Sequence, residues 1–109
     1  MEWKGMGQLT QDKVALGAVF RCEGREPYEK LVDFMLVEYP ESPSGLAFVV
    51  ASGAHAGRLL VKLPKESRPA DSLVQQVSLS WLRQHWSRWV YEGAVEKVRV
   101  CSHFEAPSL

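Results

Sequence analysis

The stretch that decides the fold is LAFVVASGAHAGRLLVKLP, residues 46–64. Two apolar runs, 46–51 and 58–63, flank a glycine-bounded turn at 53–57. Short runs rich in β-formers on either side of such a turn predict a β-hairpin. Pro64 lacks a backbone N–H, and it therefore ends the second strand.

Further strands are predicted on both sides of this hairpin. Residues 14–20 and 34–39 are short runs rich in β-formers, and each is followed by glycine or proline. Residues 95–101 alternate between apolar and polar side chains, which is typical of a strand with one face in water. The polar stretch 65–69 is expected to be a loop.

One helix is predicted in the C-terminal half, over residues 81–91. Ser80 is suited to cap its N-terminus, and Gly93 stands where a left-handed residue would end it. For residues 71–79 two alternatives stay open, a lead-in strand or an earlier turn of helix. Apolar side chains at helical spacing define one face of the predicted helix: Trp81, Leu82, Trp86, Trp89 and Val90.

These elements predict an α+β fold, a mainly antiparallel β-sheet with one principal helix of the C-terminal half packed on one face. The 109 residues are enough for one domain, expected to span 1–109 with an ordered core of about 14–101. Apolar residues make up 46% and charged residues 24%, which excludes an intrinsically disordered chain. Neither a signal peptide nor an apolar run of the roughly 20 residues that span a bilayer is present. With only two cysteines, we expect a cytoplasmic protein that does not bind membranes.

Charge is unevenly distributed, although 13 basic and 13 acidic residues cancel. Residues 1–56 hold five basic and eight acidic residues, a net charge of −3, and residues 57–109 hold eight basic and five acidic residues, a net charge of +3. An acidic stretch in the first half fits either a solvated face or a surface that steers a basic partner. The partner-binding residues that we expect are Glu23, Glu26, Glu29, Asp33, Glu38 and Glu41.

No sequence motif for a catalytic, cofactor-binding or metal site is present. Phosphate-binding glycine loops, a nucleophile elbow and a zinc-protease helix motif are all absent. The thiol and imidazole side chains match neither a zinc spacing nor a defined nucleophilic pair; they belong to Cys22, Cys101, His55, His85 and His103. We expect buried cysteines, no enzyme activity, no catalytic or metal-ligating residues and no cofactor.

The predicted helix leaves an alternative function open. Its tryptophans are interleaved with Arg83 and Arg88, and such patterns can stack bases and pair with phosphates. Core packing of indoles that share one face is the favoured interpretation in a chain of zero net charge. A small nucleic-acid-binding module is therefore the disfavoured alternative. A small enzyme or ligand-binding domain, which would have a pocket with perturbed titratable groups, is a further alternative. A homodimer through the helix or a strand edge is compatible with any of these functions.

Five phrases occur in a fixed order along the chain: LGAVFR (16–21), DFMLVE (33–38), SGAHAG (52–57), LPKES (63–67) and WLRQHWSRWVY (81–91). Together they resemble the immunity protein 45 family over about residues 14–100. This family comprises small bacterial proteins paired with polymorphic toxins and secreted effectors. The resemblance implies a protein with no reaction of its own and no catalytic residues. It would bind one cognate toxin or effector domain in the cytoplasm and block its active site or substrate path. A nuclease-like or nucleotide-handling toxin would have a basic cleft, which we expect the acidic residues to fill.

Overall fold

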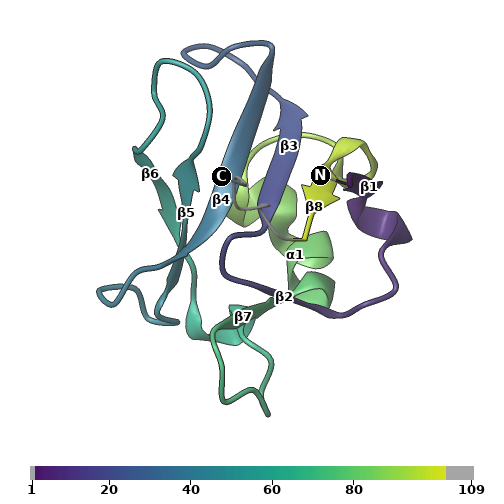
Figure 1. Ribbon diagram of the computed structural model, residues 1–109, viewed down its shortest axis with the longest axis vertical. Coiled ribbons are helices and arrows are strands. Elements are labelled where there is room, and N and C mark those ends of the chain that lie inside the picture. Colours follow the sequence, from purple (N-terminus) through teal and green to yellow (C-terminus); the bar gives the residue numbers. More distant parts are fainter. Residues whose placement is uncertain (1, 103–109) are drawn as a thin grey trace, which may run out of the picture.

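A six-stranded antiparallel β-sheet forms the body of the protein in the computed structural model, which describes residues 2–102 (Figure 1). A separate two-stranded sheet pairs β2 (Lys13–Ala15) with β7 (Gln76–Ser78). In spatial order, the strands of the large sheet are β1 (Lys4–Gly5), β8 (Arg99–Cys101), β3 (Val19–Glu23), β4 (Leu31–Glu38), β5 (Leu46–Val50) and β6 (Leu59–Lys62).

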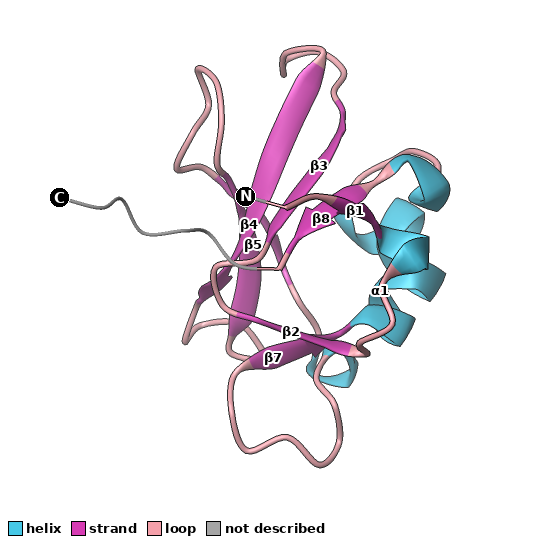
Figure 2. Cartoon of the chain, turned by 45° about the vertical axis from the view of Figure 1, so that its right-hand side comes forward, coloured by secondary structure: helices cyan, strands magenta, loops and turns pink. Residues whose placement is uncertain are grey.

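One principal helix covers one face of the large sheet (Figure 2). It begins as α1 (Leu79–His85) and continues as a π-helical turn, η3 (Trp86–Val90). The predicted α+β fold, with a mainly antiparallel sheet and one C-terminal-half helix on one face, is confirmed. No helix among residues 2–102 is long and apolar enough to cross a membrane. Short 3₁₀ turns are η1 (Met6–Gln8), η2 (Lys65–Ser67) and η4 (Val95–Lys97).

The hairpin predicted for residues 46–63 is present as β5 and β6. Its two strands pair antiparallel, with an irregularity between Phe48 and Val49. The N–H of Val50 donates to the carbonyl of Arg58 at 2.8 Å, and the N–H of Gly57 donates to the carbonyl of Val50 at 2.7 Å. These bonds close the turn that the glycines predicted.

A turn divides the predicted strand 14–20, which is therefore wrong as one element. Gly17 has a φ of 90°, in the left-handed region, and the Ala18 N–H donates to the Ala15 carbonyl. The residues before the turn pair with β7, whereas those after it pair with β4 and β8. Both halves are rich in β-formers, so the composition of the run does not reveal the break.

The helix begins earlier than predicted. Ser78 rather than Ser80 is the N-cap, and its Oγ accepts a hydrogen bond from the Trp81 N–H at 3.2 Å. The helix ends at Val90, followed by an extended residue, so Gly93 is not its left-handed cap. Strand β7 leads directly into α1 without an intervening loop, so the N-cap is the last residue of a strand.

Sheet pairing settles two further segments. Residues 71–79, left open from the sequence, end in β7 and the first residue of α1, so the lead-in strand is right for their last part. Of the predicted strand 95–101, only β8 (99–101) joins the sheet. Residues 95–97 instead form a 3₁₀ turn, in which the Val98 N–H donates to the Val95 carbonyl at 3.0 Å.

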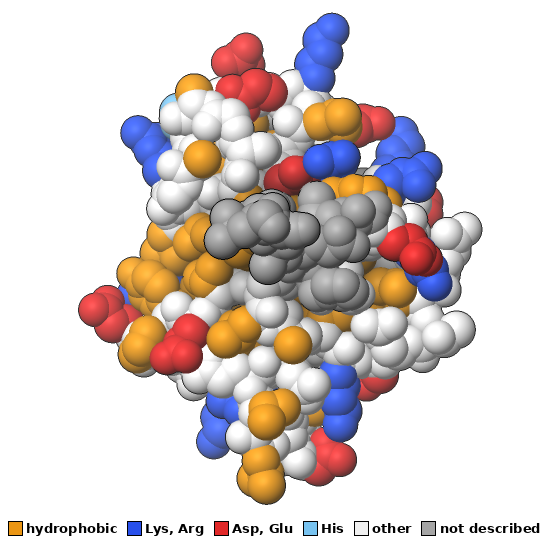
Figure 3. All heavy atoms as spheres, in the orientation of Figure 1, with side chains coloured by type: hydrophobic (Ala, Val, Ile, Leu, Met, Phe, Trp, Pro, Cys, Tyr) orange, Lys and Arg blue, Asp and Glu red, His pale blue; other side chains and the backbone are white. Residues whose placement is uncertain are grey.

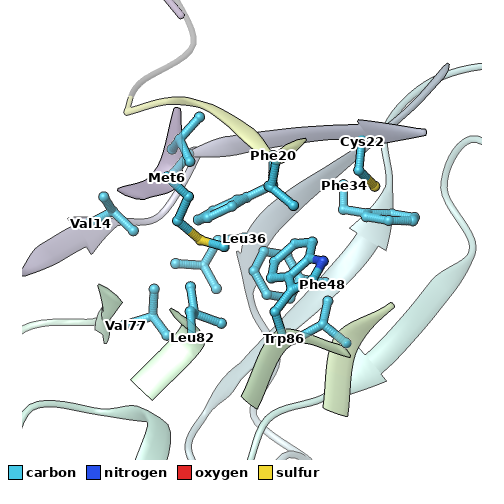
Figure 4. Packing of buried hydrophobic residues seen from close by; sticks show 14 of the residues in the cluster. Met6, Val14, Phe20, Cys22, Phe34, Leu36, Phe48, Val77, Leu82 and Trp86 are labelled. Carbon is cyan, nitrogen blue, oxygen red and sulfur yellow. The ribbon is translucent and has the colours of Figure 1, made fainter. Parts of the chain in front are cut away.

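Aromatic side chains from the sheet and the helix meet at the centre of the core (Figure 4). Trp86 is 1% exposed, and its ring centroid lies 5.4 Å from that of Phe20 and 5.8 Å from that of Phe48. The predicted burial is right for Trp86 and wrong for Trp89, which is 44% exposed. The π-helical turn is closed by the Tyr91 N–H donating to the Trp86 carbonyl at 3.0 Å. This wider turn interrupts the helical spacing from which the apolar face was predicted.

Candidate partner-binding surfaces

Among residues 2–102, no group of three or more histidine, cysteine or acidic side chains is arranged to hold a metal ion. Both cysteines are buried, and burial raises the pKa of the Cys22 thiol to about 12. His55 packs edge-on against a tyrosine ring, and His85 stacks on Trp81. His103 lies outside the described residues. The cysteines and histidines that the structure describes thus take part in packing.

The six acidic residues expected to contact a partner do not form one surface. Strand β4 separates them, since its eight residues span roughly 23 Å in an extended strand. Acidic side chains are accordingly visible near both ends of the molecule in Figure 3. Glu23, Glu26 and Glu29 lie at the β3–β4 loop end, Glu38 and Glu41 lie at the opposite end, and Asp33 lies within β4.

At the β3–β4 loop end, most of the acidic charge already has a partner. Glu23 lies 3.8 Å from the ammonium of Lys97. Glu29 Oε2 accepts a hydrogen bond from the Ala54 N–H at 3.1 Å, and this bond lowers the pKa of Glu29 below its ordinary value. Glu26 is exposed, with no ion pair among the described residues. At this end of β4, Glu23 and Glu29 are thus engaged by contacts within the fold, whereas Glu26 is not.

Asp33 is engaged within the sheet. Its carboxylate accepts two hydrogen bonds from the guanidinium of Arg21, and the ring of Trp3 lies 4.2 Å from that guanidinium. The Asp33 side chain is only 16% exposed. Contact between this carboxylate and a partner would therefore compete with an existing charge-assisted pair.

The opposite end of β4 presents two acids without ion pairs, and Arg68 connects the β4–β5 loop there to the base of an exposed apolar loop. Glu38 and Glu41 are exposed and make no ion pair among the described residues. The neighbouring loop, residues 69–75, presents Leu73 at 99% exposure and Val74 at 59%. The sequence prediction missed this loop. The sequence feature that could have revealed the loop is a pair of adjacent apolar residues inside an otherwise polar stretch.

The arginines of the helix are not equivalent. Arg83 donates to the backbone carbonyls of Met6 at 3.1 Å and Leu9 at 2.9 Å, so its guanidinium is used inside the fold. Arg88 and Trp89 are exposed. The residues available for base stacking and phosphate pairing are thus fewer than the interleaved sequence pattern predicts.

A groove of about 740 Å³ runs between the first turn of the chain and the ends of β3 and β8. Its lining combines charges of both signs, including Arg21, Glu23, Lys97 and Arg99, with apolar surface that includes Leu31. This mixed lining can make both polar and apolar contacts.

Comparison with protein families gives one match over most of the chain. A family model described as immunity protein 45 matches residues 6–100. Comparison with curated proteins and with solved structures gives no match. The matched range includes every strand of the large sheet except the two residues of β1 and the last residue of β8, as well as the whole principal helix. The chain therefore belongs to the immunity protein 45 family.

Proposed function

We propose that this chain is an immunity protein that binds a cognate bacterial toxin or effector domain in the cytoplasm. It neutralises that domain by covering its active site or substrate path and performs no reaction of its own. The observation that carries the proposal is the family match over residues 6–100. Neutralisation by occlusion needs only shape, anchoring side chains and complementary charge.

The acidic residues are the proposed contacts to a basic toxin surface. Glu23, Glu26 and Glu29 lie at one end of β4, and Glu38 and Glu41 lie at the other, so the two groups can be tested separately. Charge reversal at the group that is used slows association, mostly at low salt. Charge reversal at the other group leaves association unchanged.

The test uses the toxin gene expected directly beside the gene for this chain. That toxin is produced in a bacterial host with this chain, with an empty vector, or with an immunity protein of another family. Growth is expected only with this chain, and a stoichiometric complex is expected on affinity purification. Continued growth arrest in the presence of this chain, together with no complex, refutes the proposed function.

The same purification tests the alternative of a nucleic-acid-binding module. Recovery of RNA or single-stranded DNA that is released by salt, and lost in an Arg88→Ala/Trp89→Ala variant, supports that alternative. A purified complex that contains the toxin and no nucleic acid contradicts it.

A further inference from the structure

We propose that an extended segment of the toxin domain adds to the open edge of β6 as a further strand of the large sheet. The segment places an apolar side chain against Trp89 and acidic side chains opposite Lys62 and Lys65. This inference rests on the proposed function and adds a contact separate from the acidic residues of this chain.

Strand β6 is the outermost strand on its side of the large sheet, and within residues 2–102 no strand pairs with its second edge (Figure 1). In the part of the chain that the structure describes, its backbone groups make no hydrogen bond outside the pairing with β5. The strand has the sequence LLVK, and its first residue, Leu59, is 42% exposed. An open row of N–H and C=O groups beside exposed apolar side chains is a template for another extended chain. The edge itself therefore specifies the kind of occupant.

The direction of the Lys62 backbone groups follows from the neighbouring residue. The Leu63 N–H donates to the Leu46 carbonyl at 3.0 Å, so the Leu63 backbone faces β5. Successive residues of a paired strand turn their N–H and C=O groups to opposite edges. The N–H and C=O of Lys62, which lies opposite Ala47, therefore point away from β5 and toward the open edge.

An aromatic ladder on the principal helix, formed by Trp81, His85 and Trp89, lies on the same side of the molecule. The ring centroid of Trp81 lies 4.5 Å from that of His85 and 6.0 Å from that of Trp89. Arg83, on the other flank of the helix, donates to the N-terminal segment that follows β1, at the opposite edge of the sheet. Turn η3, which carries Trp89, packs next to β6. Because alternate side chains of a strand point to one face, a strand paired with β6 would direct every second side chain toward Trp89.

The charges along β6 indicate an acidic occupant. Residues 57–65 include Arg58, Lys62 and Lys65 and no acidic residue, and Glu66 follows in η2. All three basic side chains are exposed, and none forms an ion pair among the described residues. Acidic side chains on the added strand would complement these charges and steer the strand to this edge.

The same charges disfavour a second copy of this chain as the occupant. Antiparallel pairing of β6 with β6 of another copy would bring the basic residues of both segments together, with no acidic residue within either segment 57–65 to neutralise them. Like charges across a strand pair are destabilising, and lysine on an edge strand opposes self-pairing. The edge thus favours a strand of opposite charge over a copy of itself.

The experiment measures the affinity of the purified chain for the purified domain encoded by the adjacent toxin gene. Lys62→Pro removes the outward N–H and places a ring at the edge, so it is expected to weaken binding by about 30-fold or more. Lys62→Thr is the matched control, because it removes the same charge and keeps the N–H, and it is expected to stay within about 5-fold of the wild type. Unchanged thermal midpoints verify that both variants are folded.

Amide hydrogen exchange of the wild-type chain gives a second measurement, which decides the question if Lys62→Pro does not fold. The Lys62 amide is expected to exchange at least about 10-fold more slowly in the complex than in the free chain. The Leu73 amide, which also makes no hydrogen bond among the described residues, is expected to exchange equally fast in both.

The aromatic contact is tested by truncation. Trp89→Ala is expected to weaken binding by about 10-fold, because Trp89 anchors the added strand. Leu31→Ala is the control for loss of an exposed apolar side chain, since Leu31 is 59% exposed and lies in β4. It is expected to bind within about 2-fold of the wild type.

Charge reversal tests the chemistry of the occupant. Lys62→Glu/Lys65→Glu is expected to slow association about 10-fold at low salt, with the difference shrinking as salt is added. Lys30→Glu/Arg99→Glu reverses two other exposed basic residues that form no ion pair among the described residues. This control is expected to associate within about 2-fold of the wild-type rate.

The outcomes separate this inference from the proposed function. If the wild-type chain binds the toxin, Lys62→Pro binds as tightly as Lys62→Thr, and the Lys62 amide exchanges at its free rate in the complex, the inference is wrong while the function stands. Loss of self-association in Lys62→Pro with toxin affinity unchanged likewise overturns it, because β6 then pairs with a second copy. If the wild-type chain does not bind the toxin, the function fails and the inference fails with it.

Discussion

Arg21 and Asp33 face each other across β3 and β4, and their side chains form two parallel charge-assisted hydrogen bonds. Nε donates to Oδ1 at 2.8 Å, and Nη2 donates to Oδ2 at 3.0 Å. The hydrogen bonds to Asp33 raise the pKa of Arg21 above its ordinary value. This pair lies on the sheet face opposite the helix, and it leaves Asp33 committed to the fold.

Replacement of Asp33 by asparagine is therefore expected to lower the free energy of unfolding by about 1 kcal/mol. The figure stays modest because the Arg21 side chain is 39% exposed and regains water when the pair is lost. Urea denaturation provides the measurement. Glu38→Gln is the control in the same strand, and its expected cost is below about 0.5 kcal/mol. Equal costs for the two variants would show that the Arg21–Asp33 pair contributes nothing to stability.

Trp86 is buried and Trp89 is exposed, so replacement by alanine is expected to lower the free energy of unfolding by different amounts at the two positions. Trp86→Ala is expected to cost about 3–5 kcal/mol, because it leaves a cavity between aromatic rings of the core. Trp89→Ala is expected to cost less than about 1 kcal/mol, because the side chain is already 44% exposed. Chemical denaturation of both variants, under one set of conditions, checks the difference. Similar costs would contradict the packing described for the π-helical turn.

Gly53 and Gly57 differ in what a methyl group would meet. Both have positive φ, 73° and 94°, so alanine is strained at either position. A methyl group at Gly53 would also collide with the Glu29 carboxylate, whereas nothing lies within 4 Å at Gly57. Gly53→Ala is therefore expected to destabilise the fold more than Gly57→Ala, through loss of the hydrogen bond between Glu29 and Ala54. In a Glu29→Ala background this excess is expected to vanish, and an excess that persists there refutes the explanation.

Cys22 is expected to be almost inert in the folded protein. Burial is the main reason why the pKa of its thiol rises from 9.0 to about 12, and the nearby negative charges of Asp33 and Glu23 contribute to the same rise. At about pH 8 its thiolate fraction, and hence its reaction rate with a thiol reagent, is expected to be about 1,000-fold below that of an ordinary cysteine. A Cys101→Ala variant isolates the reaction, and addition of denaturant supplies the rate of the exposed thiol. Fast labelling in buffer alone would show that β3 opens locally.

Local signals in the sequence determined the hairpin of β5 and β6. Glycines that permit positive φ, a proline that cannot donate, and two short β-forming runs act within about 20 neighbouring residues. The existence of the helix and its placement in the C-terminal half follow in the same way from apolar spacing. The resemblance to the immunity protein 45 family likewise required only the order of short phrases, and the family match confirms it.

Tertiary structure alone decided where the surface features lie. The six acidic residues are close in sequence. Because β4 is an extended strand, its two ends are far apart, and five of these acidic residues are divided between the two ends. Trp89 lies outside the core because the π-helical turn changes the helical spacing. The Arg83 guanidinium donates to backbone carbonyls that are 74 or more positions away in the sequence. Arg68 joins two loops that are distant in sequence, because its guanidinium donates to the carbonyls of Ser44 and Val74. Composition and spacing report on neighbours along the chain, whereas these contacts depend on the packing of segments remote from one another.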